Sequence, residues 1–210
     1  MNITKLAENY VNEHPSIRDC LKNDLINYSS LSRLIATESN INLKKNFDAI
    51  LIACRRLRRK LKQEDIFERR ILRILKDSKV EIKNKIIAIV LEKDIFFETL
   101  LNLEKEIKSR KEIFKIIEGV SAITIITSED FIDLIRKNFK NKIILENRNL
   151  VEITIKSPTE LETTPGTYAY LCSIFGDNNI NIVETLSCYT DTIFLIDEKD
   201  TGKVMSLLRF

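Results

Sequence analysis

The side chains that could carry out acid–base or metal chemistry are few in this chain of 210 residues. His14 is the single histidine, which excludes HExxH zinc sites and most serine or cysteine nucleophile systems, because each needs an imidazole. The four glycines all lie beyond residue 118 and are too far apart to form a phosphate-binding loop. Catalysis would have to rest on carboxylates, lysines or thiols alone. We therefore expect no enzyme, no metal site and no cofactor.

Cysteine spacing and hydropathy indicate the cellular compartment of the protein. The cysteines show no CxxC spacing and are expected to be small buried hydrophobic residues; they are Cys20, Cys54, Cys172 and Cys188. No apolar run approaches the roughly 20 residues of a membrane-spanning helix. The N-terminus carries acid early and lacks the apolar segment of a signal peptide. These features predict a cytoplasmic protein without membrane association.

A dense basic cluster is the first pattern that could bind a partner. Its members are Arg55, Arg56, Arg58, Arg59, Lys60 and Lys62. In a helix predicted from Asn46 to about Lys62, Arg55, Arg59 and Lys62 share one outer face. Such a helix is about 25 Å long and would fit a DNA major groove. Cations late in a helix also complement its dipole, so a solvated face or a helix that docks a protein partner stays open.

The basic cluster belongs to a segment that is predicted to be helical throughout. Residues 1–79 hold 17 Lys and Arg against 10 Asp and Glu. The helices are expected to start at Ser16, at Ser29 or Ser30, at Asn46 and at Asp65. The last of them is predicted over Asp65–Lys76, with Phe67, Ile71, Leu72 and Leu75 buried. The order resembles a helix-turn-helix head, but the connection Ser39–Lys45 is longer than the motif's three or four residues.

The C-terminal part alternates β-branched runs with helical stretches. Strands are expected at 86–92, 114–118, 120–127 and 143–146, with helices at 94–112 and 130–139. The pattern repeats about 64 residues later, with strands at 150–157, 180–187 and 192–196 and helices at 166–177 and 201–208. The second unit lacks a fourth strand, which either an earlier segment or a partner chain should supply. The predicted fold class is α+β, with a helical domain (1–79) followed by two ferredoxin-like βαββαβ units (80–148 and 149–210).

A second candidate site is the turn Thr164-Pro165-Gly166-Thr167, which opens the helix predicted at 166–177. Proline in a first helical turn followed by glycine lets a ligand approach the backbone closely. The free N–H groups at such a helix start suit an anion such as an amino-acid carboxylate. The alternative is that Pro165 and Gly166 only make the turn, and that the unit serves assembly.

Residues 150–208 resemble the ACT domain, a small ligand-sensing module of aspartokinases and other amino-acid-linked regulators. The resemblance rests on the segments Thr164–Leu171, Phe175–Glu184 and Thr192–Ile196. It implies that an amino acid binds between the Pro-Gly turn and the start of the next strand, often across an interface between units. The ligand-binding residues so implied are Thr164, Pro165, Gly166, Thr167, Asn179, Ile180 and Asn181. Thr164 departs from the Asp or Asn that many ligand-binding members carry, and Glu160 or Glu162 could supply that charge.

The preceding segment, residues 86–148, resembles a degenerate ACT unit by its order of elements only. Tandem units of this kind are similar to the regulatory region of aspartokinases, although this chain has no kinase domain. Residues 149–210 hold 4 Lys and Arg against 9 Asp and Glu and lack the basic-Gly-aromatic signature of RNA-stacking sheets. An RNA-binding sheet is therefore excluded.

Two functions remain from the sequence. The first is a regulatory protein that senses an amino acid or related small metabolite through ACT units, forms a homo-oligomer through them, and binds double-stranded DNA with its helical head. The alternative is an allosteric or assembly partner of a biosynthetic enzyme, with no DNA binding.

Overall fold

The chain folds into two compact units, Met1–Arg69 and Arg70–Phe210. This computed structural model describes the backbone of residues 2–62 and 65–209 and the side chains of residues 2–62 and 69–209. The first unit is helical, and the second combines helices with an antiparallel sheet. None of the described helices is long and apolar enough to cross a membrane.

The first unit, called the head below, contains four helices that enter its core. They are α1 (Ile3–Glu13), α2 (Pro15–Lys22), α3 (Tyr28–Glu38) and α4 (Leu43–Leu61). Their apolar faces meet in one cluster that includes Val11, Leu21, Ile35, Ile50 and Cys54. Burial raises the pKa of the Cys54 thiol to about 11, which keeps it protonated.

Asparagine side chains start three of these helices. Asn2, Asn27 and Asn42 accept hydrogen bonds from the backbone N–H groups of Lys5, Ser30 and Lys45. The predicted starts at Ser29 or Ser30 and at Asn46 were therefore late, because asparagine caps a helix as well as serine does. Since α4 begins at Leu43, four residues connect it to α3 and the predicted seven-residue connection is wrong.

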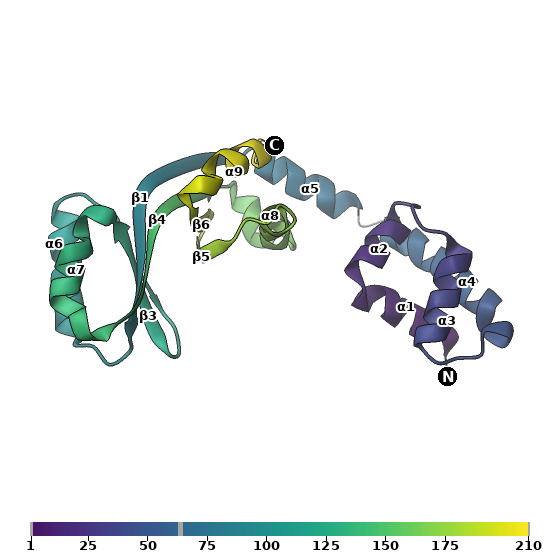
Figure 1. The fold of residues 1–210 in the computed structure, drawn as a ribbon. Helices are drawn as coiled ribbons and strands as arrows, with labels where there is room; N and C mark the ends of the chain where they lie inside the picture. Colours follow the sequence, from purple (N-terminus) through teal and green to yellow (C-terminus); the bar gives the residue numbers. More distant parts are fainter. Residues whose placement is uncertain (1, 63–64, 210) are drawn as a thin grey trace. The chain divides into compact units, whose positions relative to one another are not determined.

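The second unit is built on a sheet of six antiparallel strands in the order β2-β3-β1-β4-β6-β5. Its long strands β1 and β4 lie side by side (Figure 1). The strands are β1 (Lys79–Glu92), β2 (Phe114–Glu118), β3 (Ala122–Ser128), β4 (Ile143–Lys156), β5 (Ile182–Cys188) and β6 (Asp191–Asp197). The helices are α5 (Asp65–Lys76, which enters this unit from Arg70 onward), α6 (Phe97–Ser109), α7 (Ile132–Phe139), α8 (Thr167–Gly176) and α9 (Thr201–Leu207).

Two 14-residue strands, β1 and β4, run through both halves of this sheet. Their pairing extends from Lys79 opposite Lys156 to Leu91 opposite Ile143. The first half consists of β1, α6, β2, β3, α7 and the start of β4. The second half consists of the end of β4, α8, β5, β6 and α9, with the start of β1 beside β4. The strand that the sequence left unassigned thus comes from an earlier segment of the same chain.

The sequence analysis did not predict the full length of these two strands. Predicted strands at 143–146 and 150–157 are one strand, β4, and β1 begins seven residues before the predicted Ile86. Lys85 and Asn149, with φ of 56° and 54°, stand directly before the paired residues Ile86 and Leu150. These left-handed residues interrupt the regular pairing where both strands pass from one half to the other.

The helices cover one face of each half, and the two opposite faces form a shared core. Ile87, Ile89 and Leu91 pack under α6 and α7, whereas Phe194 and Ile196 pack under α8 and α9. Side chains of the other face form a separate cluster, called the inner cluster: Ile86, Ala88, Ile126, Leu150, Ile193 and Leu195. The sheet therefore curls until its two halves bury each other.

Polar contacts fix this inner face. Glu152 on β4 is only 1% exposed, and its carboxylate accepts a hydrogen bond from the ammonium of Lys115 on β2. Lys83 Nζ lies 3.9 Å from Glu152 Oε1. Thr124 Oγ1 on β3 donates to Glu184 Oε1 on β5 at 3.2 Å. The Lys115–Glu152 and Thr124–Glu184 contacts join strands of different halves, whereas Lys83 and Glu152 are neighbours on the paired strands β1 and β4. The curled arrangement is therefore specified by charge as well as by apolar burial.

Helix α5 was predicted as part of the head, but its buried side chains belong to the second unit. Ile71 and Leu75 lie in the cluster under α8 and α9. Leu72, predicted to be buried, is exposed, and the prediction for Phe67 lies outside the described side chains.

Several smaller predictions were wrong for local reasons. In α6, Phe97 and Leu101 are exposed, because the buried face of the helix runs through Leu100, Leu103 and Ile107 at i, i+3 and i+7. Cys172 and Cys188 are exposed, since each lies on the solvent side of its element.

The buried carboxylate gives a stability prediction. We expect Lys115→Met to reduce the free energy of unfolding of the second unit by roughly 3 kcal/mol, because the mutation leaves Glu152 without its nearest cation. Lys83→Met is the matched control and should cost less than about 1 kcal/mol, because the Lys83 ammonium is half exposed and lies 3.9 Å from the carboxylate. Urea denaturation of the full chain measures both. Equal effects of the two variants would contradict the role given to Lys115.

Candidate functional site

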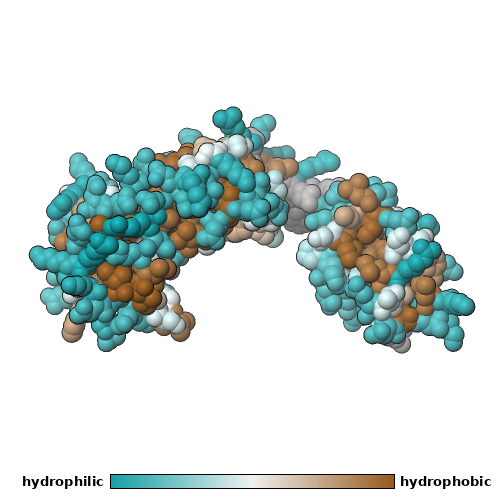
Figure 2. Space-filling view, in the orientation of Figure 1, coloured by the Kyte–Doolittle hydropathy of each residue, from teal (hydrophilic) through white to brown (hydrophobic). Residues whose placement is uncertain are grey.

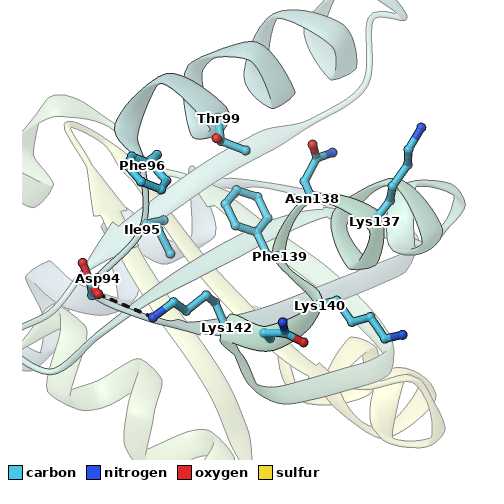
Figure 3. A pocket seen from close by; sticks show the side chains of 10 residues that line it. Asp94, Ile95, Phe96, Thr99, Lys137, Asn138, Phe139, Lys140 and Lys142 are labelled. Atoms are coloured by element: carbon cyan, nitrogen blue, oxygen red, sulfur yellow. Dashed lines mark hydrogen bonds and ion pairs between the residues drawn. The ribbon is translucent and has the colours of Figure 1, made fainter.

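The first half of the sheet contains a cavity of about 400 Å³ beside the start of α6 (Figure 3). Its walls come from the loop after β1, the first turn of α6, and the end of α7 with the following turn. The side chains that shape it are Asp94, Ile95, Phe96, Thr99, Phe139 and Lys142. The volume falls in the range of small-molecule sites.

The cavity combines apolar walls with charge at its rim. The Phe139 ring lies across from Ile95 and Phe96, and Phe96 is 85% exposed. Lys142 Nζ bonds to Glu92 Oε2 at 2.9 Å and lies 3.5 Å from Asp94 Oδ2. The hydrogen bond to Glu92 raises the pKa of Lys142, so its charge is retained at neutral pH. Lys137 and Lys140 also line the cavity, but their ammonium groups point away from its centre (Figure 3).

Sequence reasoning missed this cavity because its residues come from two segments about 40 positions apart and form no motif. The available signal was local. Ile95 and Phe96 are apolar residues placed between the end of a strand and the start of a helix, where polar caps are usual.

The Pro-Gly turn lies before α8 and not in its first turn, where the sequence placed Pro165. The helix begins at Thr167, and its N-cap residue Gly166 has φ of 89° and no side-chain cap. The threonines on either side of Pro165 and Gly166 bond internally, since Thr164 Oγ1 donates to the Glu160 carbonyl at 2.7 Å and Thr167 Oγ1 to the Thr164 carbonyl at 3.1 Å. Both threonines are buried. Pro165 and Gly166 remain exposed.

The structure separates the residues that the resemblance groups at one site. Thr164–Thr167 lie at the start of α8, whereas Asn179, Ile180 and Asn181 follow its end. Ten helical residues span about 15 Å. Asn179, with φ of 55°, ends this segment, and Ile180 turns back so that its N–H bonds to the Phe175 carbonyl. One chain therefore does not bring the two groups together.

Three cations of the basic cluster contact other residues of the head. Arg58 pairs with Asp24 at 2.9 Å, and Lys60 pairs with Glu8 at 2.8 Å. The Arg55 guanidinium lies 5.9 Å from the centre of the Tyr28 ring, a cation–π distance. The pKa of Tyr28 is raised, mainly because the phenol is desolvated by burial and to a smaller extent because it donates a hydrogen bond to Asp24.

The other three cations of the cluster are exposed. Among the residues that the structure describes, Arg56, Arg59 and Lys62 form no ion pair. Two cations of the predicted outer face, Arg59 and Lys62, thus have no ion-pair partner in the described part of the chain.

With this geometry established, two solved structures show what the fold is similar to. The chain matches the aspartate kinase of Clostridium acetobutylicum with a TM-score of 0.52 and 14% identity, covering 62% of this chain and 33% of the enzyme. It matches the ligand-free regulatory subunit of aspartate kinase from Thermus thermophilus with a TM-score of 0.50 and 14% identity, covering 61% of this chain and 92% of the subunit.

The matched part of the chain has an ACT-like fold. It spans about one third of the Clostridium enzyme, and the likeness concerns the fold alone. No protein-family model matches the sequence, and a search of curated proteins found none similar to it.

Gly166 gives a direct test of the α8 turn. We expect Gly166→Ala to lower the free energy of unfolding by about 1–2 kcal/mol, because a left-handed backbone disfavours a Cβ. Gly202 is the matched control in a helix, because its φ is not positive and no atom lies within 4 Å of an added Cβ. Thermal unfolding should show a loss for Gly166→Ala and none for Gly202→Ala. The same Tm for both variants would contradict this assignment.

Proposed function

We propose that this chain is a non-enzymatic regulatory protein that senses an amino acid or a related small metabolite through its ACT-like sheet. The observation that carries this proposal is the fold, which is similar to that of the regulatory subunit of aspartate kinase from Thermus thermophilus over 92% of the subunit. The open cavity at α6 supports it, because a sensor needs a place for its effector. The scarcity of histidine and of glycine-rich loops argues against catalysis by the chain itself.

We further propose that each half of the sheet is a ferredoxin-like unit. The order β1-α6-β2-β3-α7-β4 supports this for the first half. In the second half, β4-α8-β5-β6-α9 follows the same order, with the start of β1 in the place of the last strand.

Two places suit the effector. In the first half, the cavity offers the Phe96 and Phe139 rings to an apolar body and Asp94 to an ammonium group. In the second half, the start of α8 carries the predicted residues Thr164, Pro165, Gly166 and Thr167. Because α8 separates these from Asn179, Ile180 and Asn181, we propose that a second copy of the chain supplies the latter group in a homo-oligomer.

Effector binding is tested with the full chain and the twenty protein amino acids in a thermal-shift panel. We expect at least one of them to raise the Tm, because a ligand that binds only the folded state stabilises it. Phe96→Ala should reduce that rise if the effector occupies the α6 cavity. Phe97→Ala is the control, since Phe97 is similarly exposed but does not line the cavity. No rise with any amino acid would contradict the sensing function.

We also propose, in agreement with the sequence, that the head binds double-stranded DNA. The four-residue connection between α3 and α4 has the length of a helix-turn-helix turn. The unpaired cations Arg56, Arg59 and Lys62 supply charge for phosphate contacts.

The DNA proposal predicts a salt dependence. Replacing Arg56, Arg59 and Lys62 together by Ala should reduce the slope of log K against log salt by about 2.7, at roughly 0.9 per lost phosphate contact. The control replaces Arg58, which Asp24 already neutralises, and should change the slope little. Fluorescence anisotropy with a labelled duplex measures both. Absence of duplex binding at low ionic strength would contradict the DNA proposal.

A second candidate is a head that docks onto a protein partner, such as a biosynthetic enzyme. Apolar side chains on the head's surface favour it: Leu25 is 77% exposed, and Leu34 and Ile52 are also exposed. Brown, apolar surface is visible among the hydrophilic side chains of the head (Figure 2). If the head does not bind duplex DNA, docking onto a protein partner stays the proposed role of the head.

A further inference from the structure

Helix α5 is anchored to the segment that leads into α8. At its C-terminal end, Ser78 Oγ donates to the Ile74 carbonyl at 2.7 Å and lies 2.9 Å from Ser157 Oγ. Ser157 directly follows β4. Nearer its middle, Arg70 Nη2 donates to Thr163 Oγ1 at 3.3 Å. These contacts place α5 over both ends of the loop that precedes the Pro-Gly turn.

Ile71 makes the closest approach to that turn. A Cβ built on Gly166 would lie 3.4 Å from Ile71 Cδ1. Ile71 is 6% exposed and joins the apolar cluster of Leu171 and Phe175 in α8. The side of Gly166 on which its Cβ would stand is therefore packed against a side chain of α5, while Gly166 itself stays exposed.

The equivalent place in the first half has no such cover. There, residues 93–96 connect β1 to α6, and the cavity opens beside the helix start. In the second half, residues 157–166 connect β4 to α8, with Leu161 and Ile71 buried near the helix. The same turn is thus open in one half and filled by the chain's own apolar side chains in the other.

We propose that α5 is a displaceable plug of the Pro-Gly turn. In the docked state Arg70 and Ile71 cover Thr163 and Gly166. An effector that enters beside the Gly166 backbone binds only when these two residues have moved away. This inference rests on the proposed sensing function and names how its second site is regulated.

The position of α5 in the chain would let release of the plug affect the head. Residues before Arg70 lead directly to the head, so α5 is the covalent connection between sensor and head. An effector that binds the undocked state better than the docked state shifts the population toward the undocked state. Release of α5 then changes the length and direction of helix available to the head.

The test compares Ile71→Ala with Leu72→Ala in the full chain. Ile71 covers the turn, whereas Leu72 is its exposed neighbour on the same helix. The probes are the twenty protein amino acids, and their affinities are measured by calorimetry. We expect Ile71→Ala to bind at least one amino acid about tenfold more tightly than the wild type, because the competent state is more populated. Leu72→Ala should bind like the wild type.

A second variant tests the plug with less risk of unfolding the protein. Arg70→Ala removes only the hydrogen bond to Thr163 from an exposed side chain. We expect it to speed hydrogen exchange at residues 159–168 without ligand, and Leu72→Ala to leave that exchange unchanged. Unchanged exchange in Arg70→Ala overturns the plug.

The outcomes separate the plug from the sensing function. Equal affinities in the wild type and Ile71→Ala overturn the plug and leave sensing intact. If an amino acid binds only to Ile71→Ala, or binds it more tightly than the wild type, the result supports the plug and the sensing function. No binding by any of the proteins overturns both.

Discussion

The pairing of β1 with β4 along their whole lengths is the constraint on which the second unit depends. Each strand is the first strand of one half and the last strand of the other. Neither half can complete its sheet edge alone, and an incomplete edge would expose unpaired backbone groups. The two ACT-like halves therefore fold as one body, in which Glu152 and the inner cluster join the faces that the helices leave uncovered.

The shared strands also connect the two places proposed for an effector. The α6 cavity follows the end of β1, and the Pro-Gly turn follows the end of β4. A ligand that shifts either helix start would therefore act on a strand that both halves use. Helix α5 is a third element of the same kind, since it leads into β1 and its Ile71 side chain packs beside Gly166. Under the proposed sensing function, this contiguous packing would link effector binding to the position of α5.

Local patterns in the sequence predicted most elements but not their sharing. The short apolar run of β6 and the Pro-Gly turn could be recognised in the sequence, because hydrophobic runs and turn chemistry are local properties. The start of β1 was missed although Val80 and Ile82 alternate with charged residues, since lysine-rich segments are typical of surfaces. The α6 cavity was missed because Phe139 and Asp94 meet only in three dimensions. The basic cluster was read correctly as exposed charge, but its pairing with Asp24 and Glu8 depends on tertiary packing.

The central claim is that the ACT-like sheet binds an amino acid at its helix starts. It is tested most directly by backbone amide chemical shifts of the isotope-labelled full chain, titrated with each of the twenty amino acids. The account predicts saturable shifts that cluster at Asp94–Thr99 with Asn138–Lys142, at Thr163–Tyr168, or at both. Shifts confined to the head, or no saturable shift with any amino acid, would contradict it.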